Sequence, residues 1–247
     1  MKLCFVGDLH GCIYDMIKML PIEREGIDAI ISVGDFGIWP DPSKVDKKTR
    51  EKGSIGDFPK IWEEQYLPCP VPIYFCKGNH EDFDFLANLW DPRYFNHDPK
   101  PNLIPVTRIL PNLIYCPNGS LVILGRLKIG FMGGSYASSK FEKHPTKMYE
   151  KGRRHFHRIE YDYLIEHGPI DILVTHEPMD KDGNRYHTDL VAQTEAEIVF
   201  SGHHHRFRCE SNLSIIYVQL GIVGSLNWYG IVDTSRQGTH RFPIFGS

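Results

Sequence analysis

Short runs of apolar residues recur along the 247-residue chain, and most of them end at a glycine followed by a polar residue. Apolar runs of about four to eight residues that are bounded by turn residues are typical of buried β-strands. The strands predicted in this way cover residues 3–6, 28–33, 71–76, 170–175 and 198–201.

Helices are predicted at residues 13–20, 60–66 and 158–167, and the last of these ends at Gly168-Pro169. The order of strand, helix and strand over residues 3–33 predicts a βαβ unit. Such a unit places Asp8 and Asp35, which follow its two strands, at the same carboxyl edge of a parallel sheet. That edge is where open α/β sheets bind ligands.

The pattern changes after residue 112 to shorter runs separated by turn signals such as Pro117-Asn118-Gly119. Residues 113–116, 121–124 and 128–132 are predicted to form an antiparallel meander, which begins a second sheet. Residues 214–218 and 229–233 are predicted to complete that second sheet. The tail after Asp233 is predicted to be irregular.

Two segments, residues 37–59 and 136–157, show little periodicity, and we interpret them as substrate-side insertions in a single domain spanning residues 1–247. Basic and aromatic residues alternate from Lys140 to Arg158, a composition that suits a phosphorylated or nucleic-acid substrate. A solvated surface loop is the alternative reading of this run. Arg153 and Arg154 are the candidate substrate-binding residues within it.

Composition narrows the class of protein. With 41% hydrophobic residues the chain can bury a sizeable core, and its formal net charge of −3 creates no overall field that would recruit nucleic acid or an anionic membrane. The 6 cysteines include no C-x-x-C pair, which favours reduced thiols over a disulfide framework. No stretch approaches the length of a transmembrane helix. We therefore expect a cytoplasmic protein without a membrane partner.

The candidate chemistry lies directly after the predicted strands. Asp8 and His10 are two residues apart, so on an extended strand end both side chains would face the same way. A polar turn that caps the following helix is the alternative for this pair. Asp35 follows the second strand, and two carboxylates brought to one edge repel each other unless a cation lies between them.

The later strands end in amide and imidazole side chains. Asn79 offers a neutral oxygen ligand, and His80, one residue on, would point elsewhere and could act as a proton donor. His203 and His205 would share a face, whereas His204 would point away. The candidate metal ligands are Asp8, His10, Asp35, Asn79, His176, His203 and His205. This set is large enough for two cations that share Asp35, as phosphoryl chemistry requires.

In their order and spacing these motifs resemble the calcineurin-like metallophosphoesterase superfamily, and the resemblance spans residues 1 to about 233. The motifs are Asp8-Leu9-His10, Gly34-Asp35, Gly78-Asn79-His80-Glu81, His176 and Gly202-His203-His204-His205. The resemblance implies an α/β fold, a sandwich of two mixed β-sheets flanked by helices. It also implies one metal held by Asp8, His10, Asp35 and His205. It implies a second metal held by Asp35, Asn79, His176 and His203, with His80 acting on the substrate.

The motifs differ in places from those of particular subfamilies. Phosphoprotein phosphatases continue the second motif with Asp-Arg-Gly, whereas Asp35 is followed here by Phe36-Gly37-Ile38, so a protein substrate is not expected. Lariat-RNA debranching enzymes look similar around Gly-Asn-His-Glu and Gly-Gly-Ser but carry a cysteine where this chain has Asp8. An aspartate there resembles bacterial phosphodiesterases and nucleotide hydrolases, which hold two metals tightly.

The resemblance therefore implies a dinuclear-metal phosphoesterase that hydrolyses phosphodiesters with a metal-bridging hydroxide as nucleophile. Its cofactors would be two divalent ions, with Mn, Fe and Zn all compatible with the donor types. Its substrate would be a phosphorylated small molecule or a nucleotide, and a nucleic acid is a further candidate. The alternatives are a phosphomonoesterase or nucleotide hydrolase of the same superfamily, or a metal-binding scaffold without turnover.

Overall fold

The computed structural model of the protein describes most of the chain. The described residues are 1–51, 55–90, 104–148, 150–178, 185–211, 214–235 and 243–246.

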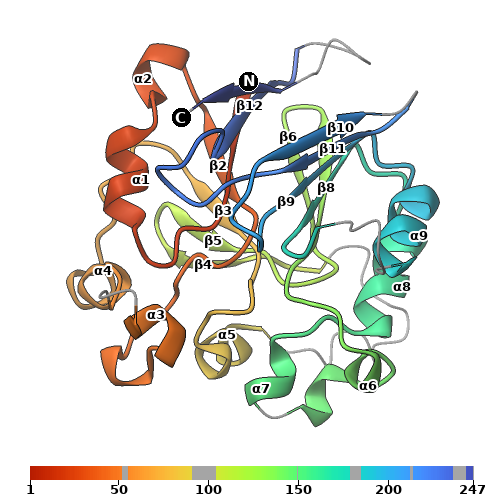
Figure 1. Ribbon diagram of the computed structural model, residues 1–247, viewed down its shortest axis with the longest axis horizontal. Coiled ribbons are helices and arrows are strands. Elements are labelled where there is room, and N and C mark those ends of the chain that lie inside the picture. The colour runs from red at the N-terminus through yellow and green to blue at the C-terminus, as the bar shows by residue number, and fades with distance from the viewer. Residues whose placement is uncertain are drawn as a thin grey trace.

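A seven-stranded mixed sheet, in the order β13-β12-β1-β2-β3-β5-β4, forms the first layer of strands in the described part of the chain (Figure 1). Its strands are β1 (Lys2–Val6), β2 (Ala29–Ser32), β3 (Ile73–Phe75), β4 (Thr107–Leu110), β5 (Leu113–Tyr115), β12 (Tyr229–Asp233) and β13 (Ile244–Gly246). The central strands β1, β2, β3 and β5 run parallel, and the flanking pairs are antiparallel.

A six-stranded mixed sheet, in the order β10-β11-β9-β8-β7-β6, forms the second layer within the described residues. Its strands are β6 (Leu121–Leu124), β7 (Leu127–Met132), β8 (Ile172–Thr175), β9 (Ile198–Ser201), β10 (Arg208–Ser211) and β11 (Ile216–Gln219). Here β7, β8, β9 and β11 are parallel, and antiparallel hairpins close both edges.

Helices cover the outer faces of the two sheets, with α1 and α2 beside the first sheet and α8 and α9 beside the second (Figure 1). The helices are α1 (Ile13–Met19), α2 (Ile22–Glu25), α3 (Lys47–Glu51), α4 (Phe58–Glu64), α5 (Phe83–Leu89), α6 (Ser138–Phe141), α7 (Glu150–Arg153), α8 (Arg158–Glu166) and α9 (Arg185–Thr194). Short 3-10 turns occupy Pro42–Lys44 and Pro145–Lys147.

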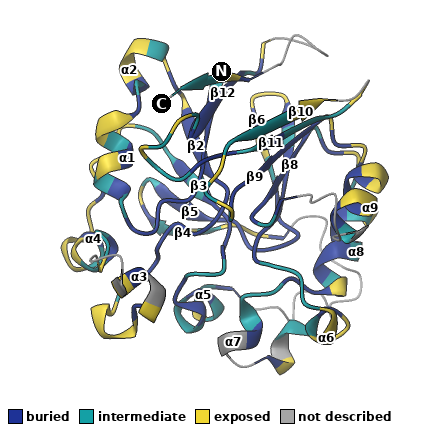
Figure 2. Cartoon of the chain, in the orientation of Figure 1, coloured by how far each residue is buried: buried dark blue, intermediate teal, exposed yellow. Residues whose placement is uncertain are grey.

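Alternation along each strand builds three apolar layers. Leu3 and Phe5 of β1 face the space between the sheets, whereas Cys4 and Val6 face the layer that contains α1. The rings of Phe5 and Phe200 stack at 4.0 Å and join the sheets across this interior. The central strands β1, β2, β8 and β9 are consequently buried almost throughout, whereas exposed positions concentrate on the outer sides of the helices and on edge strands such as β10 (Figure 2). The predicted sandwich of two mixed sheets between helices is confirmed.

Three predictions about the chain after residue 112 are wrong. β5 pairs with β3 and β4 of the first sheet, because all three of its residues are buried and it needs neighbours on both faces. β12 pairs antiparallel with β1, where Gly230 lies opposite Phe5. The tail after Asp233 is not wholly irregular, since β13 extends this sheet by pairing with β12. Apolar periodicity marks a strand but carries no information on which sheet receives it.

Helix positions differ from the prediction by small amounts. α4 begins at Phe58 rather than Lys60, because Pro59 is accommodated in the first turn, where its missing N–H costs nothing. The segment 37–59, for which no element was predicted, contains α3 and a 3-10 turn among its described residues. No helix within the described residues has the length and apolarity needed to cross a membrane.

Candidate metal centre

The candidate ligands follow the carboxyl ends of β1, β2, β3, β8 and β9, which the two sheets bring to one edge of the sandwich. The backbone there turns sharply. His10, Asp35, His203 and His205 have positive φ angles of 46°, 45°, 71° and 57°. The extended geometry expected for Asp8 with His10, and for His203 with His205, is therefore wrong. Tight turns in left-handed conformations bring these side chains together instead.

Glycine is required at two of these turns because backbone and ligand approach each other closely. A Cβ atom on Gly78 would lie 2.0 Å from Oδ1 of Asp35, and one on Gly202 would lie 2.2 Å from Oδ1 of Asp8. Any side chain at either position would displace a carboxylate of the site.

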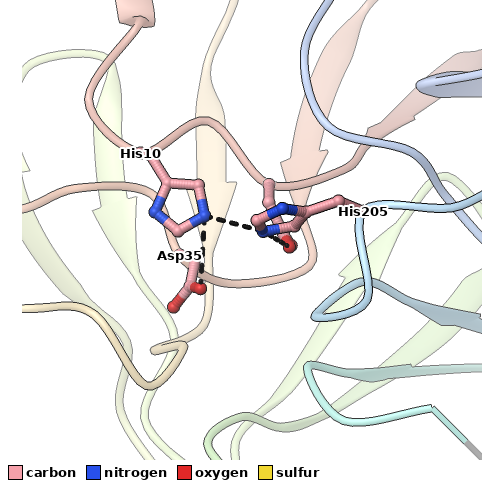
Figure 3. Close-up of side chains that lie close together, drawn as sticks. His10, Asp35 and His205 are labelled. Carbon is pink, nitrogen blue, oxygen red and sulfur yellow. Dashed lines mark hydrogen bonds and ion pairs between the residues drawn. The ribbon is translucent and has the colours of Figure 1, made fainter. Parts of the chain in front are cut away.

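Four side chains form a compact first cluster. One ligand atom from each of Asp8, His10, Asp35 and His205 lies within 4.8 Å of all the others, and only His205 is not buried. Nε2 of His10 lies 2.9 Å from Nε2 of His205 and 3.6 Å from Oδ2 of Asp35. Nε2 of His205 lies 3.2 Å from Oδ2 of Asp8. His10, Asp35 and His205 point toward a common centre (Figure 3).

A second group of donors meets at the other oxygen of Asp35. Nε2 of His176 lies 3.5 Å from Oδ1 of Asp35 and 2.9 Å from Oδ1 of Asn79. Nδ1 of His203 lies 3.2 Å from the same His176 nitrogen. The structure thus brings all seven predicted ligands into one constellation in which Asp35 belongs to both groups.

The pKa values of one carboxylate and one imidazole of the site are shifted. Burial opposes ionisation of Asp35, but the nearby His176 and His10 rings outweigh burial and lower its pKa. Burial, assisted by His176, lowers the pKa of His203 to about 4. Neutral imidazole is the form that binds metals.

The donors present fit a divalent cation. Two imidazole nitrogens lie only 2.9 Å apart, next to two buried carboxylates. Their lone pairs and negative charges repel one another at this distance, and a cation between them would relieve that repulsion. Imidazole, carboxylate and amide oxygen together form a borderline donor set that Mn, Fe and Zn accept.

His80 lies beside these groups, and both its backbone and its ring are held by hydrogen bonds. Its backbone N–H donates to Oδ1 of Asp35 at 2.8 Å, and its ring Nδ1 lies 2.7 Å from Oδ2 of Asp46. Burial opposes ionisation of Asp46, but hydrogen bonds from His80 and Thr49 lower its pKa. The sequence analysis missed Asp46. The sequence signal that could have indicated it is an aspartate directly before a short helix, because a helix N-cap accepts the N–H of the residue three positions later. The N–H of Thr49 does donate to Asp46.

Glu81 is a second residue whose role the sequence analysis missed. Its buried carboxylate accepts N–H groups of Phe36, Gly37 and Ile38 at 2.8, 3.0 and 2.7 Å. Burial and the charge of Asp35 raise the pKa of Glu81 to about 8, and the N–H donors of Ile38, Phe36 and Gly78 act against that shift. Glu81 therefore fixes the turn that carries Asp35.

The centre opens into a hollow of about 180 Å³. The described residues that line it are His10, Asp35, Thr49, Asn79, His80, His203 and His205. The ring of His204 is exposed and lies 5.0 Å from that of His203, outside the ligand cluster, as predicted.

The predicted substrate-binding arginines are not among the described residues that line this hollow. The guanidinium of Arg153 pairs with Asp84 at 2.5 Å, and its side chain lines a separate hollow with Trp90 and Glu160. The backbone carbonyl of Arg154 accepts the N–H of Ser135. A substrate role for these two residues stays a prediction.

The chain is similar to proteins of known sequence and to proteins of known structure. Lariat debranching enzymes of Arabidopsis thaliana and Schizosaccharomyces pombe are 24% identical to the chain over 193 and 185 aligned positions, and the matches cover 72% and 68% of it. The chain spans only 42% and 36% of the length of these curated relatives. A dimetal phosphatase from Danio rerio has a similar fold, with a TM-score of 0.50, 10% identity and coverage of 94% of this chain and 91% of that one.

The family model for calcineurin-like phosphoesterases matches residues 1–207, which include every motif of the constellation. The protein therefore belongs to the calcineurin-like phosphoesterase family.

Proposed function

We propose that the protein is a dinuclear-metal-dependent phosphoesterase that hydrolyses phosphodiesters. The observation that carries the proposal is the position of Asp35. Its Oδ2 faces the group of His10 and His205, whereas its Oδ1 faces the group of His176 and Asn79. A carboxylate with a different donor group at each oxygen is suited to hold two cations close together.

Divalent cations held by the two donor groups around Asp35 would supply Lewis acidity, which makes a water molecule a stronger nucleophile and offsets negative charge on the phosphate. The chain's own residues supply the remaining functions. Asp46 holds Nδ1 of His80 at 2.7 Å, so proton delivery to the leaving alkoxide would take place from Nε2. Glu81 keeps the turn of Asp35 rigid. The insertions at 37–59 and 136–157 of the single domain would contact the substrate, the first from the side of Thr49.

The charge of the hollow favours a diester over a monoester. The described residues that line the hollow include no lysine or arginine. A phosphomonoester carries up to two negative charges, so its additional oxyanion would call for a further fixed cation, whereas a diester carries one. The arginine that follows the second motif in phosphoprotein phosphatases is also missing after Asp35.

Hydrolysis of bis(p-nitrophenyl) phosphate and p-nitrophenyl phosphate, each with added Mn²⁺ and with chelator, tests the proposal. We expect turnover that requires metal and is faster on the diester. Faster turnover of the monoester would overturn the diester preference and indicate a phosphomonoesterase or nucleotide hydrolase. No turnover of either substrate by protein shown to hold two metals would favour a binding scaffold.

A further inference from the structure

A second hollow lies on the other side of the loop that carries His203 and His205. It has a volume of about 620 Å³ and is lined by His204, Arg206, Phe207, Arg208 and Gln219. Along this loop, His203 and His205 line the metal hollow, whereas His204 and Arg206 line the second one. The two hollows are therefore separated by a single segment of backbone.

The sheet register places this second hollow at the same edge of the sandwich as the metal centre. Arg208, at the start of β10, lies directly opposite Gln219, at the end of β11. β11 runs parallel to β9, with Gln219 in register with Ser201, and Ser201 immediately precedes the loop that carries the ligands. A substrate held at the metals could therefore continue along this edge without crossing the molecule.

The face of β10 and β11 that forms the hollow is the one turned away from the sheet interior. Cys209 and Val218 are cross-strand neighbours that pack into the layer between the two sheets. Arg208 and Gln219, one residue away on each strand, must point to the opposite side. Their polar groups thus face outward beside the loop rather than into the core.

The two arginines that line this hollow differ in whether an acidic residue pairs with them. The guanidinium of Arg208 donates to Glu210 at 2.8 and 2.6 Å, so its charge is largely neutralised. Arg206 is exposed and forms no ion pair with any residue in the described ranges. Phe207 is half-buried and packs edge-on against Phe245 at 4.9 Å in the layer between the sheets, so it borders the hollow from the inner side. A guanidinium without an ion-pair partner in the described ranges, beside the amide of Gln219, is suited to bind a phosphate and the hydrogen-bonding edge of a base.

We propose that this hollow is a subsite for the nucleotide that flanks the scissile bond of an oligonucleotide. Arg206 binds the flanking phosphate, while Gln219 contacts its base. This subsite rests on the proposed phosphodiesterase function and makes Arg206 a specificity-determining residue. It predicts that the enzyme prefers oligonucleotides to small diesters that lack a second phosphate.

The test compares kcat/KM on a thymidine trinucleotide, a uridine trinucleotide and bis(p-nitrophenyl) phosphate for the Mn²⁺-loaded wild type and Arg206→Gln. We expect the ratio of trinucleotide to small-diester kcat/KM to fall about tenfold in Arg206→Gln, as for the loss of a charge-assisted hydrogen bond. The slope of log kcat/KM against log salt for a trinucleotide should become shallower by roughly 0.7. Arg24→Gln, an equal charge change on exposed helix α2, is the matched control and should leave the ratio at the wild-type value.

The outcomes separate the subsite from the catalytic proposal. An unchanged ratio in Arg206→Gln, or an equal fall in Arg24→Gln, would overturn the subsite and leave the phosphodiesterase intact. Wild-type hydrolysis of the small diester but of neither trinucleotide would do the same. A larger effect on the uridine or the thymidine substrate would support the subsite and identify RNA or DNA as its ligand. Absence of metal-dependent turnover on all three substrates would overturn both proposals.

Discussion

Nδ1 of His80 and Oδ2 of Asp46 lie 2.7 Å apart, although 34 residues separate them in the sequence. Asp46 is itself fixed by the N–H and the hydroxyl of Thr49, at 2.9 and 3.1 Å. The carboxylate selects the ring tautomer with the proton on Nδ1 and stabilises the protonated ring. The segment 37–59 therefore acts on the candidate acid rather than only bordering the site.

Asp46→Asn should lower kcat on bis(p-nitrophenyl) phosphate by about 10–100-fold, as for other groups that orient a functional side chain. The variant should retain the wild-type metal content, because Asp46 is not in the ligand cluster. Its kcat should also begin to fall at a lower pH on the alkaline side, because protonated His80 loses its carboxylate partner. Steady-state kinetics across pH, with metal analysis of the same samples, measure both effects.

Asp41→Asn is the matched control, since Asp41 is exposed in the same segment and caps Ser43 without contacting His80. We expect wild-type kinetics for it. If Asp46→Asn kept the wild-type kcat and pH profile, the proposed positioning role of Asp46 would be wrong.

His80→Ala and Asp35→Asn should differ in a diagnostic way. His80→Ala should retain metal but lose about 10²–10⁴-fold in kcat, the usual contribution of a general acid. Asp35→Asn removes the carboxylate shared by both donor groups, so it should lose metal as well as turnover. Metal analysis and circular dichroism on both variants separate these effects from misfolding. A fully active His80→Ala enzyme would exclude the proposed acid.

The convergence of the candidate ligands was predictable from sequence because each follows a recognisable strand and turn. Gly34-Asp35 and Gly202-His203 occur where an apolar run ends, and the carboxyl ends of parallel strands meet at one edge. The extended backbone expected at His10 and His205 is nevertheless wrong, because both residues have left-handed backbone conformations in tight turns. Local pattern located these residues, whereas tertiary contacts determined how they point.

The remaining relationships could not be predicted from local pattern. Asp46 meets His80 only because the segment 37–59 folds back over the edge of the sheet, and nothing in its periodicity specifies that contact. β12 joins the first sheet by pairing with β1. The two strands are far apart in the sequence, so no local pattern indicates that they pair. Contacts between distant segments depend on packing of the whole domain, and apolar runs alone are compatible with several partners.

At pH 9, where Glu81 with its pKa of about 8 is ionised, Glu81→Gln should lower the free energy of unfolding by about 2 kcal/mol. Both carboxylate oxygens of Glu81 accept backbone N–H groups, so the amide of glutamine would place its own donor against one of them. Urea denaturation measures the change, and metal affinity should fall with it because the turn of Asp35 loosens. Glu64→Gln, at an exposed helix position, is the control. Equal stability of Glu81→Gln and wild type would contradict the proposed anchoring.

His187 should make stability depend on pH. Its ring is fully buried against Phe156, neither ring nitrogen has a hydrogen-bond partner among the described residues, and burial lowers its pKa to about 4. Between this value and the unfolded value of about 6.5, the unfolded chain binds more protons, so stability falls as pH falls through that window. His187→Leu should reduce the loss of unfolding free energy between pH 7 and pH 5 by about 2 kcal/mol, measured by urea denaturation. An undiminished pH dependence in the variant would show that His187 does not titrate in this way.

The most direct test of the account is a titration of chelator-treated protein with Mn²⁺, in which bound metal and hydrolysis of bis(p-nitrophenyl) phosphate are measured in the same samples. Because Asp35 faces two donor groups, we predict that the chain binds two ions and that turnover rises with occupancy of the second. Full activity with one ion per chain, or activity in metal-free protein, would contradict the proposed dinuclear phosphodiesterase.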